Sequence, residues 1–302
     1  KSCYTFLTSP YRKANVYSLS KTAVPASAIH EIVRHHLNGR AIRSIEELKD
    51  GLFNAAYRLE LADGQVTILK VAPPDHIRVL RYEKAIMTAE VDMMRLVRAQ
   101  TEVPVPEIYA YDPTRRLIDQ DFYLMANIPG APLNKLRKDM SEQEQREIDR
   151  EAGDLTRQIN ALQGPAFGYV AQPESQAPSW RAAFEGMLEG VLADGVEAGV
   201  ALPLPYDQIR ERASSWYPVL DAINTPQLVH WDLWDGNIFV DPETRRINGI
   251  VDFERALWGD PLMEAAFGDL REQSPYMEGY GRPMLDKPSQ KCRRLMYNIY
   301  LN

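Results

Sequence analysis

Residues 228–261 constrain the fold of this chain more than any other part of its sequence. Two short apolar runs, 238–240 and 247–251, flank a polar turn, which is the pattern of a β-hairpin. Asn237 lies at the start of the first strand and Asp252 follows the second, so the hairpin should bring their side chains close together. Carboxylate and amide oxygens are ligands that Mg²⁺ accepts in proteins. The sequence therefore predicts a magnesium site at the open end of this hairpin.

A second acid lies just before the hairpin. Asp232 precedes Asn237 by five residues, in a loop that we expect beside the same ion. A carboxylate there can accept the proton of a hydroxyl group that attacks a phosphoryl group. Asp and Asn are also common turn formers. The joint spacing between predicted strands favours a functional site over simple turn residues.

The pattern His-x-Asp-x-x-x-x-Asn, followed by an apolar strand that ends in Asp, resembles the catalytic core of the protein-kinase-like fold. A closer resemblance is to the aminoglycoside phosphotransferase family. It is carried by HWDLWDGN at 230–237, IVDFE at 250–254 and GDP at 259–261. That family also contains choline, homoserine and methylthioribose kinases. The resemblance implies an enzyme that uses ATP and Mg²⁺ to phosphorylate a hydroxyl group of a small molecule.

The resemblance also assigns roles to the residues of this segment. Asp232 would orient and deprotonate the acceptor hydroxyl, while Asn237 and Asp252 would hold Mg²⁺. His230 is the second candidate catalytic residue, and we expect it to brace the loop through hydrogen bonds. Glu254 stands where protein kinases carry Gly, and no long activation segment follows, which points away from a regulated protein kinase.

Two further acids, Asp260 and Glu264, follow Asp252 in the chain. Asp260 lies in a turn that should lead into an apolar helix, and we expect it to cap that helix. Glu264, one turn later, could face the acceptor.

Strand patterns dominate the first half of the chain. The runs 55–61 and 65–72, joined by an Asp-Gly turn, predict a hairpin. The preceding segment, 49–54, contains one glycine whose backbone can approach phosphate closely. It lacks the G-x-G-x-x-G of protein kinases, although the resembled family often has fewer glycines. We expect three residues of this segment at the ATP phosphates: Gly51, Phe53 and Asn54.

Lys70 lies inside an apolar strand, where an ammonium group must either reach solvent or find a partner. A helix predicted over 83–99 carries Glu90 on its apolar face, with Glu83 as the rival on the same face. The resemblance favours Glu90. It implies that Lys70 pairs with Glu90 and binds the α and β phosphates of ATP.

The apolar strand 122–132 runs into a Pro-Gly turn, as a hinge between two lobes would. By resemblance, Met125 would lie behind the adenine, with the Ala126 carbonyl and the Ile128 N–H at the purine edge. Helices are predicted at 25–39, 141–163, 180–196 and 205–220. Four acids of the 180–196 helix and its end could bind a polycation or could simply be solvated: Glu185, Glu189, Asp194 and Glu197.

These patterns predict an α+β, two-lobed, protein-kinase-like fold. We expect a β-rich N-terminal lobe over residues 1–127 and a larger helical lobe over 128–302 that carries the catalytic loop and the metal-binding hairpin. The acceptor could be an aminoglycoside or another cationic antibiotic, which would confer antibiotic resistance. It could also be an amino-alcohol or a sugar, as in the choline, homoserine or methylthioribose kinases. A nucleotide-binding module without catalysis is disfavoured because the expected site residues are all present.

Composition limits the partners and the compartment. The net charge is −7 and the pI is about 5.4, which argues against nucleic acid as a partner. No apolar run reaches membrane-spanning length, no signal peptide is evident, and Cys3 and Cys292 look like free thiols, so we expect a cytoplasmic protein. The sequence starts at Lys1, has no Met before Met87, and ends in a helical pattern. We therefore expect that natural residues are missing at both ends.

Overall fold

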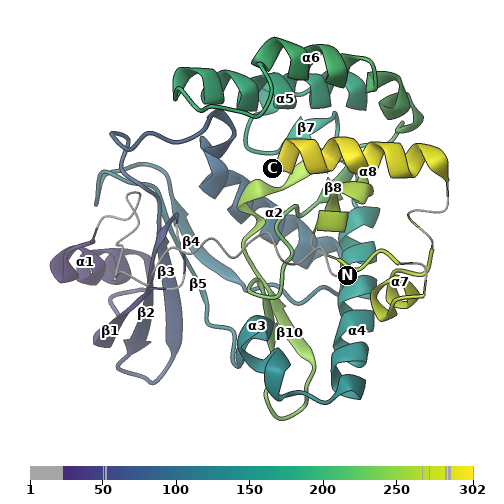
Figure 1. The fold of residues 1–302 in the computed structure, drawn as a ribbon. Helices are drawn as coiled ribbons and strands as arrows, with labels where there is room; N and C mark the ends of the chain where they lie inside the picture. The colour runs from purple at the N-terminus through teal and green to yellow at the C-terminus, as the bar shows by residue number, and fades with distance from the viewer. Residues whose placement is uncertain are drawn as a thin grey trace.

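The computed structural model describes residues 23–301, apart from positions 50, 52, 267, 272, 283, 285 and 286. Two lobes form an α+β fold of the protein-kinase-like type, which confirms the predicted fold class (Figure 1). Cys3 lies outside the described residues, and Cys292 is a free cysteine of intermediate exposure. No helix in the described ranges is both long enough and apolar enough to span a bilayer.

An antiparallel sheet forms the N-terminal lobe, with its strands in the order β1-β2-β3-β5-β4. Buried and half-buried side chains alternate along β2, as expected for a strand with one face on a core. Helix α1 covers the sheet through buried Ile29, Ile32 and Val33. The bounds are α1 Ala26–His36, β1 Ile42–Leu48, β2 Ala55–Leu61, β3 Val66–Val71, β4 Ile108–Asp112 and β5 Phe122–Ala126.

Helix α2, Ile86–Gln100, begins three residues later than predicted. Residues Arg81–Glu83 form a separate 3₁₀ turn, Lys84 is extended, and Ala85 has a left-handed backbone with φ of 56°. These conformations break the helical hydrogen-bond pattern before Ile86. Glu83 therefore lies outside the helix, while Glu90 remains on its buried face.

The C-terminal lobe is mainly helical. Its helices are α3 Leu133–Leu136, α4 Glu142–Ala161, α5 Trp180–Glu197, α6 Tyr206–Ser214, α7 Pro275–Tyr280 and α8 Pro288–Leu301. Ser141 and Glu144 form the predicted capping box of α4. The predicted helix over 205–220 was too long, because Pro218 has no N–H to donate to the Ser214 carbonyl and so cannot continue the α-helical pattern; a 3₁₀ helix, Tyr217–Ala222, follows instead.

Two small antiparallel sheets hold the segment 227–259. One has the order β10-β9-β6 and contains the predicted hairpin; the other has the order β7-β11-β8. The bounds are β6 Ala131–Pro132, β7 Gly168–Tyr169, β8 Gln227–Val229, β9 Ile238–Val240, β10 Ile247–Ile250 and β11 Leu257–Gly259. The apolar helix predicted after Asp260 is a 3₁₀ helix, Pro261–Ala266. Asp260 accepts a hydrogen bond from Leu262 N at 3.1 Å and pairs with Arg293 of α8 at 2.7 Å.

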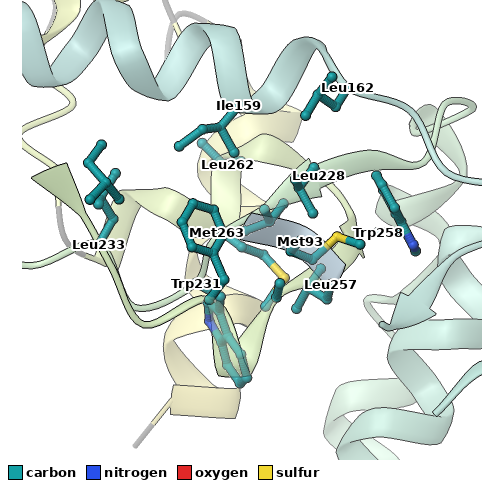
Figure 2. Close-up of a cluster of buried hydrophobic side chains, with 14 of the residues drawn as sticks. Met93, Ile159, Leu162, Leu228, Trp231, Leu233, Leu257, Trp258, Leu262 and Met263 are labelled. Atoms are coloured by element: carbon teal, nitrogen blue, oxygen red, sulfur yellow. The ribbon is translucent and has the colours of Figure 1, made fainter. Parts of the chain in front are cut away.

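The loop between β8 and β9 is anchored in the main hydrophobic core. Figure 2 shows Trp231 and Leu233 of this loop among Met93, Ile159 and Met263. Met93 comes from α2, so this helix of the N-terminal lobe packs into the same core as the loop between β8 and β9. This shared packing fixes the position of α2 relative to residues 230–237.

Candidate active site

His230 is fully buried, and both of its ring nitrogens have partners. Nε2 lies 2.9 Å from the carbonyl oxygen of Val251, and the backbone N–H of Asp232 donates to Nδ1 at 3.2 Å. Nδ1 therefore acts as an acceptor, and the ring proton lies on Nε2. Burial lowers the pKa of His230 to about 4. The imidazole is neutral near pH 7 and is fully occupied in joining the loop to the end of β10.

Glu264 supports the backbone of the same loop. Its carboxylate accepts hydrogen bonds from the backbone N–H groups of His230 at 2.6 Å and Trp231 at 3.3 Å. The second bond helps to hold Trp231 in a left-handed conformation with φ of 58°. Glu264 is 1% exposed, and burial raises its pKa to about 7. The idea that Glu264 faces the acceptor was wrong, because its oxygens are directed at the backbone of the loop.

Asp232 and Asn237 lie at opposite ends of one tight turn. The Asn237 amide donates to the Asp232 carbonyl at 2.8 Å and to its carboxylate at 3.3 Å. The Asn237 carbonyl accepts from the Val251 N–H at 3.1 Å, which places Asn237 beside the start of the Asp252 segment. Burial raises the pKa of the Asp232 carboxyl to about 6, and the Arg255 guanidinium opposes that rise.

Lys70 is the centre of an ion cluster between the lobes. Its Nζ lies 2.8 Å from Glu90, 2.6 Å from Asp252 and 3.5 Å from Glu254. Burial lowers the pKa of Lys70, but the carboxylates of Asp252 and Glu90 outweigh burial and raise it well above its ordinary value. Burial also tends to raise the pKa of Asp252, and Lys70 brings that pKa below its ordinary range.

Glu254 and Asn54 join the loop before β2 to the segment after β10. The buried Asn54 amide donates to Glu254 at 2.7 Å across 200 residues of sequence. Burial, followed by the neighbouring Asp252 carboxylate, raises the pKa of Glu254 to about 8. The loop that was expected to cover phosphate is thus held at its base by a side-chain contact rather than by a second glycine. Gly51 and Phe53 lie in this loop, next to positions outside the described residues.

The donor atoms at the hairpin suit a hard divalent cation. The hydrogen bonds described above use Nδ2 of Asn237 and Oδ1 of Asp252. Among the described residues, these bonds leave the Asn237 amide oxygen and the second Asp252 oxygen for a ligand. One carboxylate and one amide oxygen, with the other positions left to water and phosphate, match the preference of Mg²⁺. The residues therefore fit the ion that the sequence suggested.

The remaining predicted residues lie on the strand that leads to the second lobe. Met125 and Ala126 end β5, and the Met125 carbonyl accepts a hydrogen bond from the Thr67 hydroxyl at 2.8 Å. Ile128 follows in the segment between β5 and β6 and packs against Gly249 of β10. The structure thus brings Lys70, Glu90, Asp232, Asn237 and Asp252 into one region, with residues 125–128 at the junction of the lobes.

Sequence reasoning missed Arg255, gave Glu254 no role in the site and gave Glu264 the wrong role. The Arg255 guanidinium carbon lies 5.8 Å from the centroid of the Tyr82 ring, and the Arg255 charge lowers the pKa of Asp232. Glu254 and Arg255 directly follow the recognised Asp252 and Phe253, so their positions were a usable signal. For Glu264 the sequence suggested contact with the acceptor, because the backbone N–H groups that donate to it leave no side-chain signature.

The acids of α5 are mostly paired within the chain. Asp194 and Glu197 both bind the Arg81 side chain, and Glu189 binds Arg210 at 2.8 Å. Each of these carboxylates already faces a guanidinium of the chain, which weakens its attraction for a polycation. Glu185 is exposed on the same helix.

Comparison with known proteins gives a family and a set of relatives. The model of the family described as "Phosphotransferase enzyme family" matches residues 44–268. A protein of Klebsiella aerogenes, described as a "Probable ketoamine kinase", is 28% identical over 257 residues, which covers 80% of this chain and 77% of the relative.

Solved structures share the fold. The streptomycin-ATP-APH(2")-IIa ternary complex matches with a TM-score of 0.62 and 16% identity, covering 93% of this chain and 90% of the other. The macrolide 2'-phosphotransferase MphH from Brachybacterium faecium matches with a TM-score of 0.59 and 16% identity, covering 90% of this chain and 88% of the other.

Proposed function

This chain belongs to the phosphotransferase enzyme family and is an ATP-dependent phosphotransferase that acts on a hydroxyl group; from this premise, we propose that its acceptor is a small sugar-type molecule, such as a ketoamine. The acceptor proposal rests on the pairing of the α5 acids with arginines of the chain.

Asp232 is proposed as the catalytic base. The acceptor oxygen attacks the γ-phosphorus of ATP, its proton passes to the Asp232 carboxylate, and the bond between the γ-phosphorus and the β-phosphate oxygen breaks to release ADP. The Asn237 amide, which donates to this carboxylate, keeps it in place. His230 is a positioning residue, because its ring nitrogens are already bonded within the loop.

Lys70 is proposed to bind the α and β phosphates, with Glu90 holding the ammonium in position. The Asn54–Glu254 contact would keep the loop containing Gly51 and Phe53 above the phosphates. Residues 125–128 would frame the adenine, with Met125 behind the ring and the Ala126 carbonyl and Ile128 N–H at its edge. Backbone groups at this junction can read a purine without any special side chain.

Asn237 and Asp252 are proposed to hold Mg²⁺ through the oxygens identified above. When bound, this ion would neutralise negative charge on the phosphates of ATP. Asp252 suits this role because its low pKa keeps it ionised at neutral pH.

Two observations support a sugar-type acceptor over a polycationic antibiotic. Aminoglycosides carry several ammonium groups, and a site for them needs unpaired carboxylates. On α5, Asp194, Glu197 and Glu189 are instead paired with arginines of the chain. The Klebsiella relative, which this chain matches over most of its length, is described as acting on ketoamines.

An acceptor panel tests this proposal. ADP release would be measured with Mg-ATP and 1-amino-1-deoxyfructose, choline, homoserine, methylthioribose or kanamycin. We expect kcat/KM for the ketoamine to exceed that for kanamycin by about 10-fold or more, because kanamycin carries several ammonium groups that would lack free carboxylate partners and the ketoamine carries only one. A preference for kanamycin would show that the acceptor proposal is wrong while leaving phosphotransfer intact.

The protonation of Asp232 predicts how activity depends on pH. Its carboxyl has a pKa raised to about 6, and only the ionised form can accept the proton. kcat/KM should therefore fall as the pH drops through about 6. Because Arg255 lowers this pKa, Arg255→Gln should move the acid limb to higher pH. ATP also titrates in this range but is unchanged by the substitution, so an unmoved limb in Arg255→Gln would argue against Asp232 as the titrating group.

A further inference from the structure

A separate cavity of about 230 Å³ lies beside the catalytic loop. It is bounded by α5, by β7 and the residues that follow it, and by the 3₁₀ turn Arg81–Glu83. No role proposed above uses it. We refer to it as the α5 cavity.

The charged groups that line the α5 cavity neutralise each other. Asp194 accepts hydrogen bonds from both the backbone N–H and the guanidinium of Arg81. A second Arg81 nitrogen binds Glu197, and the Gln172 amide donates to the Arg81 carbonyl. A charged ligand group would therefore have to break an existing pair, and neutral ligands are favoured.

Besides these paired groups, aromatic, aliphatic and glycine residues line the α5 cavity and leave room for a flat or branched group. The rings of Tyr82 and Tyr169 are stacked with centroids 5.8 Å apart. On the facing side, Gly186 and Gly190 line the cavity, and a Cβ atom at either position would meet nothing within 4 Å. Two glycines within a helix cost stability, so space above them is consistent with a function.

Tyr169 lines this wall with its ring. Its side chain is 6% exposed, and its buried hydroxyl has no hydrogen-bond partner among the described residues. This hydroxyl exposes less than 1 Å² and does not open into the cavity, so Tyr169 contributes its ring to the wall.

The cavity lies next to the expected phosphoryl-transfer position. The Tyr82 and Tyr169 ring centroids are 6.2 Å and 6.3 Å from that of Trp231, the residue that precedes Asp232. Arg255, whose charge acts on Asp232, lies over the Tyr82 ring. A molecule with its hydroxyl at Asp232 could extend a substituent toward these rings.

We propose that the α5 cavity binds an uncharged aromatic or branched aliphatic substituent of the acceptor, which packs against the rings of Tyr82 and Tyr169. This inference rests on the proposed function and narrows its substrate class. The enzyme would favour ketoamines with a neutral apolar substituent on nitrogen over those with a free ammonium or no substituent.

The test compares three acceptors that share one sugar. They are 1-amino-1-deoxyfructose, its N-benzyl derivative and its N-(6-aminohexyl) derivative, assayed by ADP release. The wild-type enzyme should favour the benzyl compound by about 10- to 100-fold in kcat/KM, because the cavity can bury the ring. Gly190→Leu fills the cavity and should bring the ratio of benzyl to unsubstituted acceptor close to one. Ala182→Leu, on an exposed position of α5, is the matched control and should keep the wild-type ratio.

A binding measurement separates this inference from the proposed function. 4-Fluorobenzyl alcohol, followed by ¹⁹F NMR, should bind the wild-type protein and the Ala182→Leu variant but not Gly190→Leu. If no ketoamine is phosphorylated but this pattern of binding holds, the acceptor proposal fails and the cavity assignment stands. The cavity assignment is overturned if the aminohexyl compound is preferred, if substituents make no difference, or if the probe does not respond to Gly190→Leu.

Discussion

Replacing Asp232 with Asn is expected to reduce turnover by about 10²- to 10⁴-fold, the usual contribution of a positioned general base. Asn has nearly the same shape but cannot take the proton of the acceptor hydroxyl. The Lys70 cluster and the proposed Mg²⁺ ligands are untouched, so affinity for Mg-ATP should remain near the wild-type value. Steady-state ADP release and equilibrium binding of a fluorescent ATP analogue measure the two effects separately.

The matched control is Asp241→Asn. Asp241 belongs to the same hairpin, but its carboxylate accepts from the turn residues Glu243 and Thr244, away from the proposed catalytic residues. This variant should retain turnover. If Asp232→Asn turns over as fast as Asp241→Asn, Asp232 is not the base.

Replacing Lys70 with Met should be the most destabilising of the single changes considered. Lys70 lies among Glu90, Asp252 and Glu254, and its side chain is 14% exposed. Without the ammonium, these carboxylates are left close together and without their shared cation, and breaking a buried ion pair in this way costs about 3–5 kcal/mol. Urea denaturation of the wild-type and variant proteins measures the change. Mg-ATP binding should be lost as well.

The loss of stability in Lys70→Met should depend on pH. In Lys70→Met the clustered carboxylates can take up protons at low pH, so the destabilisation should be larger at pH 8 than at pH 5. The double variant Lys70→Met/Glu90→Gln should recover part of the lost stability, because it removes one of the uncompensated charges. Arg43→Met, which breaks an exposed ion pair with Glu60, should change stability little. Equal effects of Lys70→Met and Arg43→Met would contradict this account.

Local patterns in the sequence were sufficient for the main elements of the fold. Alternation in β2, the Asp-Gly turn and the capping box of α4 depend on neighbouring residues, and the structure contains all three. The same holds for the catalytic hairpin, because its spacing is local. Errors arose at helix ends, where one backbone conformation decides the outcome. Neither the left-handed backbone at Ala85 nor the break near Pro218 interrupts the apolar pattern that predicted those helices.

The candidate site was only partly predictable for a different reason. The Asn54–Glu254 hydrogen bond joins residues 200 positions apart, and no local pattern predicts such a contact. The hydrogen bonds that the loop backbone donates to Glu264 cannot be predicted from the sequence either, because backbone partners leave no side-chain signature. The sequence showed the acids of α5 but not their arginine partners. Arg81 is more than 100 residues before Asp194 in the chain, and this pairing changed the expected acceptor.

The central claim is that this chain transfers the γ-phosphoryl group of ATP to a sugar-type hydroxyl, with Asp232 as base. Incubation with γ-³²P-labelled ATP, Mg²⁺ and 1-amino-1-deoxyfructose, followed by chromatography of the small molecules, tests it most directly. We predict a labelled sugar phosphate with the wild-type protein, none when Mg²⁺ is chelated, and a trace with Asp232→Asn. Bound ATP without a labelled sugar, or equal labelling by the wild-type protein and Asp232→Asn, would contradict the claim.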